Sequence, residues 1–177
     1  MKALEISGWM SQVDLEWLAE QAKTKDIIVE VGSYQGRSTR ALGENVRICV
    51  FAVDDWQGLR TVDKNWWEGE TPEDERIALY ERFVANVHDL MDAGKVVPIH
   101  ANHAKVPELP IADMVFIDGS HDYDSVKRDI QTWLRRLRSG GLLCGHDGKQ
   151  NNLLRAVNEC LGPIKMEADL IWHWVKP

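Results

Sequence analysis

Acidic and histidine residues directly follow two short apolar runs in the second half of the chain. Asp118, His121 and Asp122 come after the run at 111–117, and His146 with Asp147 comes after a second run at 142–144. Carboxylate oxygens and imidazole nitrogens can hold a divalent ion with open coordination positions, and they can also move protons. If the two runs are neighbouring parallel strands, their ends meet and these side chains converge.

A second chemical feature is the stretch IIVEVGSYQGRSTRA at 27–41. It is typical of a buried strand, a glycine turn and a helix start. Gly32 and Gly36 allow backbone to approach a ligand closely, and Ser38 lies where the free amides of a new helix point outward. Unlike the G-x-G-x-x-G dinucleotide motif, this strand ends with a carboxylate, Glu30. A fixed anion there repels phosphate and favours a ligand that carries an amine or a sulfonium.

A third feature is the acidic pair that ends the apolar run 47–53. An acid at this position, Asp54 or its neighbour Asp55, is placed to bind both hydroxyls of a ribose. A nucleoside at one end and a cation at the other describe S-adenosylmethionine. Glu30 and the missing G-x-G-x-x-G motif argue against an oxidoreductase with a nucleotide cofactor.

The pattern of apolar residues alternates between strands and helices. We expect strands at 27–31, 47–53, 95–99, 111–117 and 142–144, helices at 11–22, 37 onward, 71–94, 126–137 and 153–161, and a closing hairpin of 164–167 with 171–175. Such alternation predicts a Rossmann-like α/β fold with a mostly parallel sheet and its strand ends on one rim. We predict one domain over 1–177, with an N-terminal helical segment at 1–25 and a lid loop at 56–71.

Composition narrows the partners. The net charge of -7 and the pI near 5.4 argue against nucleic acid and favour a small molecule. The sequence has no apolar run long enough for a membrane span and no leader-like start. Cys49, Cys144 and Cys160 stand singly in apolar patterns, which predicts reduced thiols in a cytoplasmic protein. Nothing in the sequence indicates the oligomeric state.

Five segments together resemble a known family. They are VEVGSYQGRSTRAL, FAVDDW, DMVFIDGSHDYDSVKRDI, LRSGGLLCGHD and IWHWVK. The chain from residue 27 onward is similar to class I S-adenosylmethionine-dependent methyltransferases, most closely to the branch of macrocin O-methyltransferase and a related cephalosporin-biosynthesis protein. The resemblance implies seven strands in the order 3-2-1-4-5-7-6 with helices on both faces.

The resemblance also implies site residues. The predicted cofactor-binding residues are Glu30, Gly32, Ser33, Gly36, Ser38, Asp54, Asp55, Trp56, Asn102, His103 and Asp118. Related enzymes often hold magnesium at the positions of Asp118, His146 and Asp147, where the ion orients a substrate hydroxyl and lowers its pKa. Histidine at 146 departs from that pattern, because imidazole is a poor magnesium ligand; Mg²⁺, Mn²⁺ and no metal stay open. His121 stands about where catechol-type enzymes keep a lysine base, and we predict it as the general base.

Structural interpretations stand beside these roles. Asp118 could cap its turn, and for Asp122 we favour helix capping over chemistry. His146 and Asp147 could secure their turn by hydrogen bonds. Trp66 and Trp67, the predicted substrate-binding residues, could stack on an acceptor or merely anchor their loop.

The sequence therefore predicts an enzyme that methylates a hydroxyl of a small molecule or sugar. The alternative is a binding module of the same fold that holds S-adenosylmethionine or S-adenosylhomocysteine without turnover.

Overall fold

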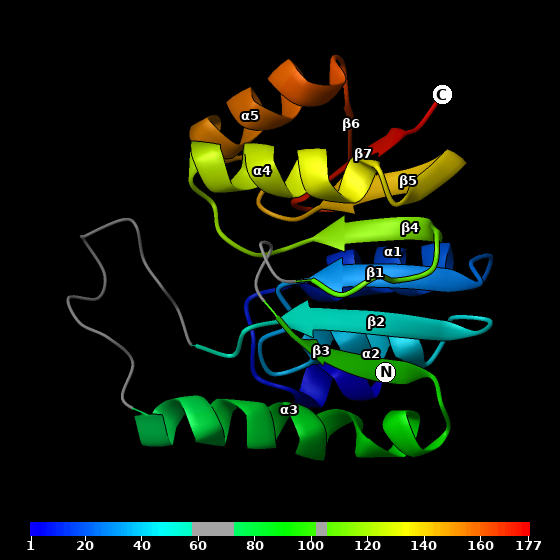
Figure 1. Cartoon of the computed structure of the whole chain (residues 1–177), viewed down its shortest axis with the longest axis vertical. Helices are drawn as coiled ribbons and strands as arrows, with labels where there is room; N and C mark the ends of the chain where they lie inside the picture. Colours follow the sequence, from blue (N-terminus) through cyan, green and yellow to red (C-terminus); the bar gives the residue numbers. More distant parts are fainter. Residues whose placement is uncertain (58–72, 102–105) are drawn as a thin grey trace.

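The computed structural model describes residues 1–57, 73–101 and 106–177, including their side chains except those of Asp74 and Glu75. Within these ranges, seven strands form one sheet in the order β3-β2-β1-β4-β5-β7-β6 (Figure 1). The strands are β1 (Ile27–Val31), β2 (Cys49–Asp54), β3 (Val96–His100), β4 (Ala112–Ile117), β5 (Leu137–Gly145), β6 (Lys165–Glu167) and β7 (Ile171–Val175). Strands β1 to β5 are parallel, and β7 runs antiparallel to both β5 and β6. The predicted fold and strand order are confirmed.

Helices cover both faces of this sheet, as predicted. They are α1 (Gln12–Ala22), α2 (Arg37–Gly43), α3 (Glu73–Asp92), α4 (Tyr123–Leu134) and α5 (Asn151–Leu161), with a short 3₁₀ turn at Lys2–Glu5. Successive side chains of a strand point to opposite faces. Accordingly, Ile28 packs in one core cluster with α1, α2 and α3, whereas Val29 packs in a second cluster with α4 and α5.

The order of the strands places the chemistry. Strand β1 lies between β2 and β4. The strands β2 and β3 are added on one side of β1 and the strands from β4 onward on the other, so the strand order reverses at the β1–β4 pair. The arrowheads of β1, β2, β3 and β4 point the same way in Figure 1, and their carboxyl ends form one rim. Ligands of such sheets bind outside this rim at the reversal point.

Two predicted helix starts are confirmed by their caps. Ser11 Oγ accepts a hydrogen bond from the Asp14 amide at 3.2 Å and begins α1. Asp122 Oδ1 accepts one from the Ser125 amide at 3.0 Å and begins α4, which confirms the capping interpretation of Asp122.

The boundary between α4 and β5 differs from our prediction. We expected a helix that continues to Leu137 and is closed by glycines, because Leu137 continues the helical spacing of apolar residues. Instead α4 ends at Leu134, and Leu137 pairs with Ala112 as the first residue of β5. The Ala112 amide donates to the Arg136 carbonyl at 2.8 Å, so the sheet takes over this segment. Among the described helices, none is both long and apolar enough to cross a bilayer.

Candidate active site

The glycine turn after β1 packs directly against the end of β4. The Asp118 amide donates to the Val31 carbonyl at 2.8 Å, and Gly32 has a φ of +89°. A Cβ on Gly32 would lie 2.3 Å from the Asp118 carbonyl oxygen. We predicted that this glycine lets backbone approach a ligand, but the partner that approaches it is the backbone of β4. Gly32 therefore fixes Asp118 beside the turn.

Glu30 is a fully buried carboxyl on β1. Its Oε2 accepts hydrogen bonds from the Ser33 hydroxyl at 2.8 Å and from the Thr39 hydroxyl. Ser38 lies in the first turn of α2, as predicted, and its side chain is a further hydrogen-bond partner of Glu30. The Oε1 atom of Glu30 is buried and has no hydrogen-bond partner among the described residues.

The charge state of Glu30 follows from this burial. Loss of water raises the pKa of Glu30 to about 7, and the hydroxyl donors oppose that rise only in part. Burial therefore opposes the ionised form that we expected, and a cation beside the carboxyl would favour that form.

The acids after β2 bind backbone amides. Asp54 Oδ2 accepts from the Tyr34 amide at 2.8 Å, and its Oδ1 accepts from the Trp56 amide at 2.7 Å. Asp55 Oδ1 accepts from the Gln57 amide at 3.1 Å. Asp54 therefore joins the glycine turn to the end of β2, a role the sequence did not indicate. Ribose binding by either acid stays a prediction.

Two other predicted cofactor residues belong to the core. Trp56 is only 1% exposed and packs edge-on against Tyr80 with a centroid distance of 4.8 Å. Its indole nitrogen donates to the Tyr34 carbonyl at 2.9 Å, so the ring is held within the fold. Cofactor binding by Trp56 stays a prediction. Gly36 has a φ of +88°, and a Cβ there would lie 3.0 Å from Val87 of α3. Asn102, His103, Trp66, Trp67 and most of the predicted lid at 56–71 lie outside the described residues.

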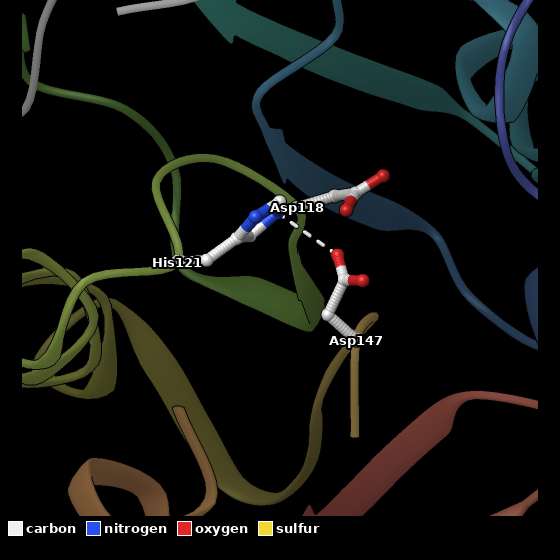
Figure 2. Close-up of side chains that lie close together, drawn as sticks. All are labelled: Asp118, His121 and Asp147. Atoms are coloured by element: carbon white, nitrogen blue, oxygen red, sulfur yellow. Dashed lines mark ion pairs between the residues drawn. The ribbon is translucent and has the colours of Figure 1, made fainter. Parts of the chain in front are cut away.

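The predicted catalytic residues do converge. Asp118 at the end of β4, His121 in the following turn and Asp147 at the end of β5 each offer a ligand atom, and these atoms lie within 4.8 Å of one another. Figure 2 shows the His121 imidazole directed at the Asp147 carboxylate, with its Nε2 2.9 Å from Asp147 Oδ2. The histidine of this pair is open to solvent, since the His121 side chain is 43% exposed. The arrangement can hold a metal ion or remove a proton.

His146 lies behind this group. Its Nδ1 is 3.3 Å from Asp147 Oδ2 and 3.7 Å from Asp118 Oδ1, and its Nε2 is 3.5 Å from Asp14 Oδ2. The side chain is 5% exposed. The group with converging ligand atoms consists of Asp118, His121 and Asp147, and metal binding by His146 stays a prediction.

The pKa values in this cluster depend on each other. Burial opposes protonation of His146, but its hydrogen bond with Asp147 and the charges of Asp118, Asp147 and Asp14 outweigh it and raise the pKa of His146 to about 9. Burial also works against ionisation of Asp147, yet hydrogen bonds from His121 and His146 hold the pKa of Asp147 well below its usual range. The neighbouring carboxylates therefore favour the protonated form of His146.

The remaining two pKa values point to a missing positive charge. Burial raises the pKa of Asp118 to about 7, although His146 works in the opposite direction. The hydrogen bond with Asp147 raises the pKa of His121. Asp118 and Glu30 also repel each other. A positively charged ligand at the β1–β4 rim would favour the ionised form of both acids.

Comparison with known protein families decides the identity. Residues 29–148 match the family described as a methyltransferase domain. The chain therefore belongs to this methyltransferase family. The match includes every residue of the Asp118, His121 and Asp147 group and ends just after it.

Solved structures share the fold of this methyltransferase domain. An S-adenosylmethionine-dependent O-methyltransferase of Thermotoga maritima superposes with a TM-score of 0.68 at 15% identity, covering 98% of this chain and 68% of that one. An O-methyltransferase of Bacillus cereus in complex with S-adenosylhomocysteine gives 0.66 at 13% identity, with 98% and 86% covered. An O-methyltransferase of Streptomyces achromogenes from tomaymycin synthesis, in complex with S-adenosylmethionine, gives 0.65 at 13% identity, with 96% and 82% covered.

A cavity of about 810 Å³ lies along α3 of the methyltransferase domain. Trp56, Tyr80 and His100 contribute to its wall, which connects it to the ends of β2 and β3. Asp118, His121 and Asp147 do not line it. The cavity is therefore separate from the group of Asp118, His121 and Asp147.

Sequence reasoning missed Asp14. Its position three residues after Ser11 predicts a role in helix capping, and the structure confirms that role. Its contact with His146 joins parts of the chain far apart in sequence, and no local pattern signals it. Asp14 also lies outside the matched range 29–148.

Proposed function

We propose that this methyltransferase domain transfers the methyl group of S-adenosylmethionine to a hydroxyl of a small molecule or sugar. The observation that carries the proposal is the convergence of Asp118, His121 and Asp147 at the ends of β4 and β5, next to the glycine turn after β1. This places a proton acceptor and two carboxylates where ligands of such sheets bind.

The residues of the rim fit this cofactor. Glu30 has a buried oxygen without a partner among the described residues, and burial raises the pKa of both Glu30 and Asp118 to about 7. A sulfonium and an ammonium group supply the positive charge that both acids lack. The aromatic cavity at the ends of β2 and β3 suits the adenosine end. The proteins of Bacillus cereus and Streptomyces achromogenes with this fold bind S-adenosylhomocysteine and S-adenosylmethionine, respectively.

The proposed reaction is one displacement. The acceptor oxygen attacks the methyl carbon in line, a C–O bond forms, and the electron pair of the breaking C–S bond stays on sulfur, which leaves S-adenosylhomocysteine. The hydroxyl proton goes to Nδ1 of His121, because Nε2 faces Asp147 and is placed to donate its hydrogen to that carboxylate. The positive charge of the cofactor lowers the pKa of His121 and frees Nδ1 for this role.

Asp118 and Asp147 would hold a divalent ion, and the ion would orient the acceptor hydroxyl and lower its pKa. Two carboxylates with open positions suit Mg²⁺ or Mn²⁺. Because imidazole is a poor magnesium ligand, we assign the ion to the two carboxylates alone and leave His146, whose Nδ1 faces Asp147 at 3.3 Å, outside the proposed ligand set. His121 then stays available as the base.

The narrower resemblance to the macrocin and cephalosporin branch suggests a sugar or a secondary metabolite as the acceptor. A binding module without turnover is not favoured: it needs no base, yet a half-exposed histidine stands beside the acids. A cytoplasmic location is part of the same proposal.

Isothermal titration with S-adenosylhomocysteine tests the cofactor, and transfer of labelled methyl to phenols, catechols and sugars tests the reaction, with the O-methyl product identified by mass spectrometry. We expect binding and transfer to at least one hydroxyl class. Binding without transfer to any acceptor, with and without Mg²⁺ or Mn²⁺, would contradict the reaction. Binding of NADH in place of S-adenosylhomocysteine would contradict the cofactor.

A further inference from the structure

Asp14 is a fully buried carboxylate that joins three separate parts of the chain. Its Oδ1 accepts hydrogen bonds from the amides of Asp169 at 3.0 Å and Leu170 at 3.1 Å, which form the turn between β6 and β7. Its Oδ2 accepts from the Ser11 hydroxyl at 2.8 Å and faces Nε2 of His146 at 3.5 Å. A charge taken out of water in this way is costly unless its partners are held in place.

His146 carries this contact to the rim. Its two ring nitrogens face opposite ways, with Nε2 toward Asp14 and Nδ1 toward Asp118 and Asp147. The backbone carbonyl of His146 accepts a hydrogen bond from the Trp172 indole at 3.1 Å, so the main chain at this point is fixed from β7. The ring is held at Nδ1 by its hydrogen bond with Asp147, whereas Nε2 is buried without a hydrogen-bond partner among the described residues and faces the Asp14 carboxylate at 3.5 Å.

We propose that Asp14 is a positioning residue of the active site: it orients the His146 ring so that Nδ1 holds the Asp118 and Asp147 carboxylates in place for methyl transfer. The role rests on the proposed function, since it acts through the residues assigned there. Asp14 lies outside residues 29–148, so the matched range does not contain the whole site. Asp14, which comes from the N-terminal segment, contributes to the site through its contact with His146.

The chain offers variants that separate this role from folding. Asp14→Asn keeps an amide oxygen for the Asp169 and Leu170 amides but removes the charge that faces His146. Ser11→Ala removes the cap of α1 and one hydrogen bond to Asp14 but leaves that charge. Ser11 contacts none of the residues at the rim and is the matched control.

We expect Asp14→Asn to lower kcat about 10- to 100-fold, the usual effect of losing a residue that orients a ligand or base from behind. The KM for S-adenosylmethionine should stay within about threefold, because the cofactor residues do not touch Asp14. Ser11→Ala should lower the Tm but keep kcat within about twofold. In a His146→Asn background, Asp14→Asn should have little further effect on kcat.

A readout that needs no turnover accompanies these rates. Nitrogen-15 NMR of the histidine rings should show a slowly exchanging Nε2–H signal that is absent from His146→Asn, shifted or lost in Asp14→Asn, and unchanged in Ser11→Ala. An unchanged signal in Asp14→Asn, or unchanged kcat, would overturn the positioning role while leaving the proposed function intact. A loss of kcat that is equal in Ser11→Ala, or that persists in the His146→Asn background, would also overturn it. Absence of methyl transfer in the wild-type protein would instead refute the proposed function.

Discussion

Nε2 of His121 lies 2.9 Å from Oδ2 of Asp147, although the two residues come from different strand ends. The contact orients the imidazole and leaves Nδ1 without a partner among the described residues. A histidine held by a carboxylate on one nitrogen and open on the other is the arrangement of a general base.

Removal of His121 tests that role. His121→Ala should lower kcat about 100- to 10,000-fold, because the proposed acceptor of the hydroxyl proton is removed. The affinity for S-adenosylhomocysteine, measured by titration calorimetry, should stay within about threefold and serves as the internal control. A variant that keeps more than half of the wild-type kcat would exclude His121 as the base.

Removal of Asp147 tests the metal. We expect Asp147→Ala to abolish any stimulation of turnover by Mg²⁺ or Mn²⁺ and to weaken Mn²⁺ binding, measured by electron paramagnetic resonance. S-adenosylhomocysteine affinity should be largely spared. His121→Ala should keep the wild-type Mn²⁺ affinity, and a matching loss in both variants would show that His121 is a ligand and not the base.

The buried acid on β1 predicts a pH dependence of stability. Burial raises the pKa of Glu30 from 4.5 to about 7, so the folded protein binds more protons than the unfolded chain in this range. Protonated Glu30 therefore stabilises the folded protein at low pH. This contribution to the free energy of unfolding is lost as the pH rises from about 4.5 to about 7, and the loss is about 3 kcal/mol in the protein without ligand. Glu30→Gln cannot ionise and should escape this loss.

Urea unfolding at pH 5 and pH 8 measures the effect. The free energy of unfolding of Glu30→Gln minus that of the wild type should increase toward pH 8, and the loss of the repulsion between Glu30 and Asp118 changes this difference in the same direction. Glu20→Gln is the control, since Glu20 is exposed on α1 and pairs only with Lys23. A difference that does not change with pH would contradict the raised pKa.

The glycine turn predicts a contrast between two alanine substitutions. Gly32 and Gly94 both have a positive φ, of +89° and +69°, so alanine is strained at each by about 1 kcal/mol. A Cβ on Gly32 would in addition overlap the Asp118 carbonyl, whereas one on Gly94 meets nothing within 4 Å. Gly32→Ala should therefore lose about 3 kcal/mol or more in urea unfolding. Equal losses in the two variants would show that the close contact with β4 does not matter.

Local patterns were sufficient for the alternation of strands and helices and for part of the site, whereas the strand order came from the family resemblance. Apolar runs that end in acids identified β4 and β5, and with them Asp118, His121 and Asp147. Spacing could not place Leu137, because it fits both a helix and a strand until Ala112 pairs with it. The burial of Trp56 was equally hidden, since its φ of 44° turns the ring back into the core.

The partners of buried acids were the least predictable part. Glu30 accepts a hydrogen bond from Thr39 of the next helix, α2, and Asp14 contacts His146, which is far from it in the sequence. Such pairs depend on which helix covers which strand end. The type of residue indicates only that a partner must exist.

The contacts of Asp14 also tie α1 to the hairpin of β6 and β7. Its carboxylate receives the amides of Asp169 and Leu170, so the turn of this hairpin is bound to the first turn of α1. A truncation that removed the hairpin would keep the glycine turn, His121 and both carboxylates, yet it would take away two of the hydrogen bonds that hold Asp14.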